Sequence, residues 1–139
     1  MSKRSKQINL ELMFTALADR TRLRLLNLMG DDEVCVCFFV EVLQTNQPKI
    51  SRHLAFLRRA GIVEARRDGL WMHYRIAETG NEDINKILYQ TRQAVAKDPE
   101  MRADRERMVS VCCGPNLPAN IKGAPIPASL ADYQCRTKC

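Results

Sequence analysis

The sequence predicts a mainly α-helical fold that carries one β-hairpin. Two observations predict it: apolar residues recur at helical spacing along most of the first 111 residues, and two β-prone runs flank an Asp-Gly turn. The chain has 139 residues, of which 45% are hydrophobic, enough to bury a single core. Four of the six prolines follow Gly114. We therefore expect one domain over residues 1–111 and a flexible Cys- and Pro-containing tail over 112–139.

Three helices are predicted before the most regular one. The first carries apolar residues at i, i+3, i+4 and i+7, namely Leu10, Met13, Phe14 and Leu17. Asp19 is suited to cap a second helix over 20–29, which the sequence Gly30-Asp31-Asp32 ends. A short apolar helix is expected over about 38–43.

The clearest helix is predicted over 48–60. Pro48 suits its first turn, and Gly61 is suited to the position that follows a helix. Its apolar face consists of Ile50, Leu54 and Leu57. Polar and basic side chains occupy the remaining faces, which predicts one buried and one exposed side.

The β-hairpin is predicted from two runs, 62–66 and 70–76, joined by the turn Arg67-Asp68-Gly69. A long helix is expected over about 82–96 and another over 99–111. Two helices joined by a short turn, the second basic, followed by a hairpin, make up a winged helix-turn-helix. In that fold the second helix enters the major groove of DNA and the hairpin is the wing.

Charge supports this interpretation. The net charge is +6, and the segment between Gln47 and Arg75 holds seven basic residues and two acidic ones. A local basic surface attracts polyanions such as DNA. We expect groove contacts from five residues at the start of the basic helix: Gln47, Lys49, Ser51, Arg52 and His53. We expect Arg66 and Arg67 to bind phosphate.

Six cysteines form three pairs: Cys35/Cys37, Cys112/Cys113 and Cys135/Cys139. The chain begins without a secretory signal pattern, and its longest apolar run, 34–40, is too short to span a bilayer. We therefore expect a cytoplasmic protein without a membrane partner, whose thiols serve as soft-ion ligands or redox groups. Side chains two residues apart diverge on a helix, so Cys35 and Cys37 can hold one ion only where the first turn is frayed or extended.

Four stretches resemble the ArsR/SmtB family of metal-responsive repressors. The basic helix QPKISRHLAFLRRAG (47–61) and the wing DGLWMHYR (68–75) resemble the recognition helix and wing of its arsenical resistance branch. LADRTRL (17–23) resembles the entry of the second helix, and VCVC (34–37) resembles the thiol motif of the arsenic- and cadmium/lead-sensing branches. The likeness covers about residues 8–97.

The resemblance implies a homodimer formed through N- and C-terminal helices, which binds an inverted-repeat operator and dissociates when thiolates capture As(III). In the arsenic-sensing branch a third cysteine stands where this chain has Val40. The third thiolate would then come from Cys112 or Cys113, of the same or the other subunit, or the two cysteine pairs would form two partial sites. Ion binding would distort the helix that supports the recognition helix.

Other inducers and a second mechanism stay open. Sb(III) and methylated arsenicals share the thiol chemistry of arsenite, and a Cd(II)- or Pb(II)-sensing repressor is the alternative within the family. A repressor that senses oxidation through its thiols is another. No organic cofactor is expected, and no enzymatic motif is visible: the chain has no Cys-x-x-Cys, Gly-rich phosphate loop or catalytic triad. No role is predicted for Cys135 and Cys139.

Overall fold

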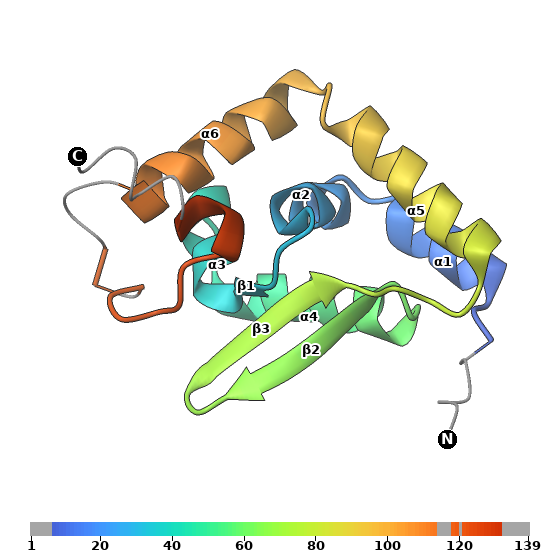
Figure 1. Cartoon of the computed structure of the whole chain (residues 1–139), viewed down its shortest axis with the longest axis horizontal. Coiled ribbons are helices and arrows are strands. Elements are labelled where there is room, and N and C mark those ends of the chain that lie inside the picture. Colours follow the sequence, from blue (N-terminus) through green and yellow to red (C-terminus); the bar gives the residue numbers. More distant parts are fainter. Residues whose placement is uncertain (1–6, 114–117, 120, 132–139) are drawn as a thin grey trace.

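The structure, a computed structural model, describes residues 7–113, 118–119 and 121–131. Its elements are α1 (Leu10–Leu17), α2 (Arg20–Met29), β1 (Val34–Cys35), α3 (Val36–Leu43), α4 (Gln47–Arg59), β2 (Val63–Asp68), β3 (Trp71–Ile76), α5 (Glu82–Val95) and α6 (Pro99–Cys113). Helix α2 lies in the middle, with α5 and α6 on one side and the β2–β3 hairpin on the other (Figure 1). The predicted winged helix-turn-helix is confirmed.

Short polar side chains fix where the helices begin. The side chains of Asn9, Asp19 and Asn46 each accept a hydrogen bond from a backbone N–H in the first turn of α1, α2 and α4, at 2.8 to 3.0 Å. Asn81 caps α5 in the same way. Each cap satisfies an amide that the helix itself leaves unpaired. The boundaries of these helices are therefore encoded locally, and the predicted positions agree with them to within one residue.

The strand β1 was not predicted. It pairs antiparallel with β3, so the sheet has the order β1-β3-β2. Helix α3 follows directly and begins at Val36, earlier than expected. The change from strand to helix cannot be predicted from the apolar run 34–40. Both elements are buried there, and a continuous apolar run shows neither the helical nor the strand periodicity.

The core surrounds α2 and the helix-turn-helix. Its fully buried side chains include Leu25, Leu28, Phe39, Leu54 and Leu57. Among the residues that the structure describes, no helix is long and apolar enough to cross a membrane.

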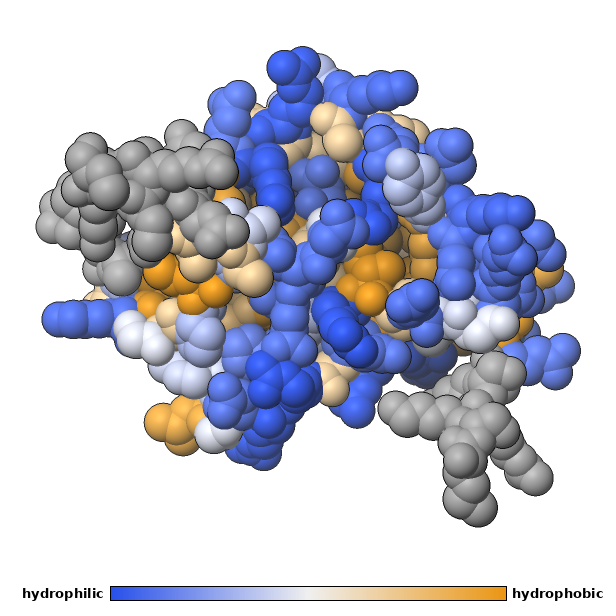
Figure 2. All heavy atoms as spheres, viewed as in Figure 1, coloured by the Kyte–Doolittle hydropathy of each residue, from blue (hydrophilic) through white to orange (hydrophobic). Residues whose placement is uncertain are grey.

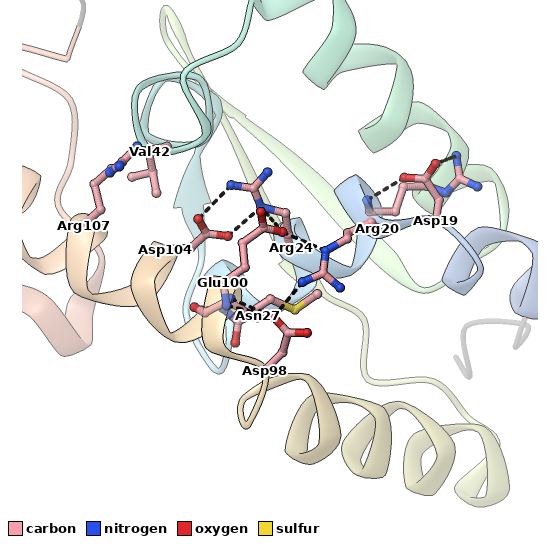
Figure 3. A network of polar contacts seen from close by, with 11 residues as sticks. Asp19, Arg20, Arg24, Asn27, Val42, Asp98, Glu100, Asp104 and Arg107 are labelled. Atoms are coloured by element: carbon pink, nitrogen blue, oxygen red, sulfur yellow. Dashed lines mark hydrogen bonds and ion pairs between the residues drawn. The ribbon is translucent and has the colours of Figure 1, made fainter.

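Polar contacts connect helix α6 to α2 (Figure 3). The Arg24 guanidinium donates two hydrogen bonds to the Asp104 carboxylate, at 2.7 and 2.8 Å, and only 6% of the Asp104 side chain is exposed. Arg20 binds Asp98 and Glu100 at the start of α6. The Asn27 amide donates to the Met101 carbonyl at 2.8 Å. These contacts fix the axis of α6, whose far end reaches α3.

Part of the C-terminal segment also packs on the core. Ile121, Ala124 and Leu130 are buried. The Ser129 amide donates to Asp32 Oδ1 at 3.2 Å, and the Ser129 hydroxyl donates to the other oxygen of that carboxylate. The proline content led us to expect a flexible tail from residue 112, yet α6 continues through Cys113 and residues 121–130 bury apolar side chains.

Replacing Asp104 by alanine should lower the free energy of unfolding by about 3 kcal/mol, because a largely buried guanidinium would lose its bidentate partner. The matched control is Glu100→Ala, which removes a carboxylate of the same helix that is half exposed and screened by water. Urea denaturation followed by circular dichroism measures both. Equal losses for the two variants would contradict the special role of the Arg24–Asp104 pair.

Candidate functional site

The exposed side of α4 carries most of the predicted groove residues. The turn between α3 and α4 is tight, with Gln44 in the left-handed backbone region at φ 51°. Ile50, Leu54 and Leu57 point into the core and fix the rotation of α4. The side chains left exposed at its start are Gln47, Lys49, Ser51 and Arg52. Amide, hydroxyl and guanidinium groups on a protruding helix are suited to reading base edges.

His53 has different surroundings from its neighbours. Its Nδ1 lies 3.3 Å from Nη1 of Arg22 and 3.8 Å from a carboxylate oxygen of Asp19. Burial lowers its pKa below the ordinary value, opposed by the nearby Asp19 carboxylate. The side chain therefore faces α2, and its predicted groove contact stays a prediction.

Arg22 links three helices, which sequence reasoning missed. Its guanidinium donates to the Ala16 and Thr15 carbonyls at the end of α1, at 2.7 and 3.1 Å. The same group lies 4.3 Å from the centroid of the Phe56 ring on α4. No spacing rule points to this role, because the three partners are brought together only by folding.

The two wing arginines predicted to bind phosphate differ in their ion pairing. Arg66 binds the Glu33 carboxylate, with Nε 2.9 Å from Oε1, and this ion pair holds the wing to the segment before β1. Arg67 forms no ion pair with any described residue and lies exposed. Leu70, at the tip of the hairpin, is 93% exposed. Of the two arginines predicted to bind phosphate, Arg67 therefore has the freer charge.

The thiols of Cys35 and Cys37 lie side by side. Cys35 is the last residue of β1 and the N-cap of α3, with extended backbone at φ −68° and ψ 141°. Cys37 lies in the first turn of α3, and its thiol donates to the Cys35 sulfur, with the two Sγ atoms 3.0 Å apart. The expected extended backbone is thus present, but it belongs to β1. The sulfurs meet while α3 is complete from Val36, so their approach requires no distortion of that helix.

The two thiols differ in acidity. Donation from the Cys37 thiol is the main cause that lowers the pKa of Cys35 from its ordinary value of 9.0 to about 7. Burial opposes this shift, and the backbone amides of Cys37, Val36 and Met72 contribute to it. The same hydrogen bond, together with burial, raises the pKa of Cys37. The pair therefore favours a single shared proton near neutral pH, with the negative charge on Cys35.

His73 is the residue of β3 that pairs with Cys35 in the sheet. Only 3% of its surface is exposed, and its Nε2 has no hydrogen-bond partner among the described residues. In the sequence His73 belongs to the predicted strand 70–76, and no pattern there gives it a role. The signal that could have identified it is the pairing of β1 with β3, which sequence periodicity does not show.

The predicted C-terminal ligands are placed only in part. Cys112 is buried in the core near the end of α6, while the side chain of Cys113 lies outside the described part of the chain. Cys135 and Cys139 also lie outside it. Within the described residues, no three His, Cys, Asp or Glu side chains gather closely enough to hold a metal ion. A third thiolate from Cys112 or Cys113 therefore stays a prediction.

Apolar side chains remain exposed on the helices predicted to form a dimer. Leu10 and Phe14 on α1 and Tyr89 on α5 are each about half exposed. A pocket between the end of α2, β3 and α5 is lined in part by Ile76 and Leu88. Figure 2 shows apolar surface in a hollow in the middle of this face. Such surface is typical of contact with another protein chain.

Comparison with known proteins places the chain beside bacterial regulators. Residues 19–65 match the family described as "Bacterial regulatory protein, arsR family". The chain is 38% identical to the arsenic resistance transcriptional regulator ArsR2 of Pseudomonas putida, over 73% of this chain and 95% of that protein. It is 50% identical to ArsR1 of the same organism over 47% of this chain. The alignments cover about half of ArsR1 and of the arsenical resistance operon repressor of Escherichia coli, at 52% and 56%.

A solved structure shares the fold. The homodimeric winged helix-turn-helix DNA-binding domain Mb0332 from Mycobacterium bovis superposes with a TM-score of 0.53 at 31% identity, over 67% of this chain and 82% of that one.

Removing the Cys37 thiol should raise the pKa of Cys35 from about 7 toward 9.0, because the main group that stabilises the thiolate is lost. Thiolate absorbance in the ultraviolet, titrated against pH, measures this in Cys37→Ala. The Cys35→Ser variant identifies which part of the wild-type titration belongs to Cys35. Because the pKa is lowered on folding, the thiolate stabilises the fold fully above pH 9 and loses that effect as the pH falls toward 7. A titration near neutral pH that survives in Cys37→Ala would contradict the assignment.

Proposed function

Because this chain belongs to the arsR family of bacterial regulatory proteins, we propose that it is a transcriptional repressor that arsenite releases from its operator. One observation carries the proposal: two thiols with their sulfurs 3.0 Å apart stand at the start of α3, the first helix of the helix-turn-helix. A soft metalloid captured there acts directly on the element that supports α4. The proteins named for arsenic resistance among its relatives support this choice of ligand.

The DNA contacts follow from exposure and charge. Gln47, Lys49, Ser51 and Arg52 read the major groove from α4, while Arg67 binds phosphate from the wing. Arg66 reaches phosphate only by sharing its charge with Glu33. His53 can contact the groove only if its side chain breaks its contacts with Arg22 and Asp19. It therefore contributes least to the affinity for DNA.

The active form is a homodimer. The half-exposed apolar side chains of α1 and α5 supply the interface, and the homodimeric Mycobacterium bovis domain supports it. A two-fold dimer presents two α4 helices to successive major grooves, so the operator is an inverted repeat.

Arsenite binding acts through the packing of α3. The helix contacts α4 on one side and α6 on the other, and Arg107 of α6 donates to the Val42 carbonyl of α3 at 3.2 Å. As(III) bound by Cys35 and Cys37 shifts the start of α3 and moves α4 out of register with the groove. DNA is released because the ligand binds the shifted state more tightly. Cys112 and Cys113 are candidates for a third thiolate.

The same thiol pair supports the alternatives. Sb(III), methylated arsenicals, Cd(II) and Pb(II) are also thiophilic. The relatives include a transcriptional repressor SmtB homologue of Synechocystis. A thiol-redox repressor is the second candidate function, since sulfurs 3.0 Å apart need only a small movement to form a disulfide.

Arg52→Ala should weaken binding to a duplex that the protein selects from a random-sequence pool by roughly 10- to 100-fold, with little change on a scrambled duplex. Arg67→Ala should weaken both duplexes alike and reduce the salt slope by about 1. Fluorescence anisotropy at several salt concentrations measures these effects. Arg102→Ala, which removes an equal charge from an exposed position on α6, is the control. Unchanged affinity in Arg52→Ala would remove that residue from the groove contacts.

Cys35→Ser combined with Cys37→Ser should give a protein that binds the same duplex and that arsenite no longer releases. Anisotropy of the bound duplex, titrated with arsenite and in parallel with Sb(III), Cd(II), Pb(II) and Zn(II), measures release. The matched double variant Cys112→Ser with Cys113→Ser tests the third thiolate. Release by arsenite that persists without Cys35 and Cys37 would place the sensor elsewhere, and release by hydrogen peroxide alone would favour the redox repressor.

A further inference from the structure

The residue that pairs with Cys35 in the sheet carries an unsatisfied buried nitrogen. His73 is 3% exposed, and its Nε2 is inaccessible to solvent and has no hydrogen-bond partner among the described residues. Leaving a buried polar atom unpaired is costly, so such an atom needs an explanation. One explanation is that a bound ligand supplies the missing hydrogen bond.

The sheet places His73 directly opposite Cys35. Cys35 and His73 are directly paired across β1 and β3, so their side chains project from the same face with Cβ atoms about 5 Å apart. The Met72 amide, one residue before His73, acts on the Cys35 thiol through a backbone hydrogen bond. The Cys35 sulfur therefore lies against this part of β3. Cys37, which is partly exposed, gives a ligand access from solvent.

The chemistry of arsenite supplies a suitable donor. Arsenous acid, As(OH)₃, carries three hydroxyl groups. Two thiols replace two of them: two As–O bonds break, two As–S bonds form, and each thiol proton leaves with a hydroxide as water. No oxidant or reductant is needed. With Cys35 and Cys37 as its two thiolate ligands, the arsenic keeps one hydroxyl.

We propose that His73 is the specificity-determining residue of the site and accepts, through Nε2, a hydrogen bond from the hydroxyl of arsenite bound by Cys35 and Cys37. The inference rests on the proposed capture of arsenite by these two thiols. The ligand class is a trivalent metalloid that keeps one hydroxyl after binding two thiolates. The bound ligand then joins the start of α3 to wing strand β3, so both DNA-contacting elements respond to it.

The test compares two ligands that differ in one group. Methylarsenite, CH₃As(OH)₂, keeps a methyl group and no hydroxyl after binding two thiols, so His73 gains nothing from it. Both ligands are titrated by calorimetry into the reduced full-length chain, as wild type and with Cys112, Cys113, Cys135 and Cys139 replaced by serine. In each background, His73→Phe removes the acceptor and His73→Gln retains one.

We expect His73→Phe to weaken arsenite binding by about tenfold and to leave methylarsenite binding unchanged, while His73→Gln keeps most of the arsenite affinity. Equal arsenite affinity in wild type and His73→Phe overturns the inference, and so does a parallel loss of both ligands in both variants, which marks a structural role. A wild-type chain that binds no arsenite overturns the proposed function itself. Failure of the proposed function is therefore distinguished from failure of the His73 inference, which concerns the His73 variants alone.

Discussion

The short pairing of β1 with β3 is the constraint on which the rest of the site depends. Two residues, Val34 and Cys35, pair with Tyr74 and His73, and the chain turns into α3 immediately afterwards. This pairing holds the first helix of the helix-turn-helix against the wing. It also gives Cys35 the extended backbone that lets its sulfur meet that of Cys37, two residues along the chain, without any loss of helix. The proposed sensing site therefore lies where the first helix of the helix-turn-helix meets the wing.

Two arginines connect α2 to α1, α4 and α6. Arg22 ties α2 to the end of α1 and to the Phe56 ring of α4, and Arg24 ties it to Asp104 of α6. Both guanidiniums are partly buried, where charge-assisted hydrogen bonds are strong and directional. Helix α6 is thereby fixed between α2 and α3, so in the proposed mechanism a movement of α3 would be passed on to α4.

Charge is distributed to suit this arrangement. The ion pairs Arg66–Glu33 and Arg75–Glu64 use basic groups of the wing to stabilise its position. Lys49 and Arg52 on α4 form no ion pair with any residue in the described ranges, so their full charge faces solvent. Ion pairs thus hold the wing in place, while the charged side chains of Lys49 and Arg52 on α4 face solvent.

The sequence by itself determined where α2, α4 and α5 begin and where the hairpin turns, because Asn and Asp caps, apolar spacing and the Asp-Gly turn act over a few residues. Only the tertiary structure decided that Cys35 belongs to a strand, that His53 faces Arg22 and Asp19, and that His73 lies beside Cys35. It also decided that residues 121–130 pack on the core despite their prolines. These features depend on pairing between segments tens of residues apart, and no local pattern in the sequence records which distant segment a residue will meet.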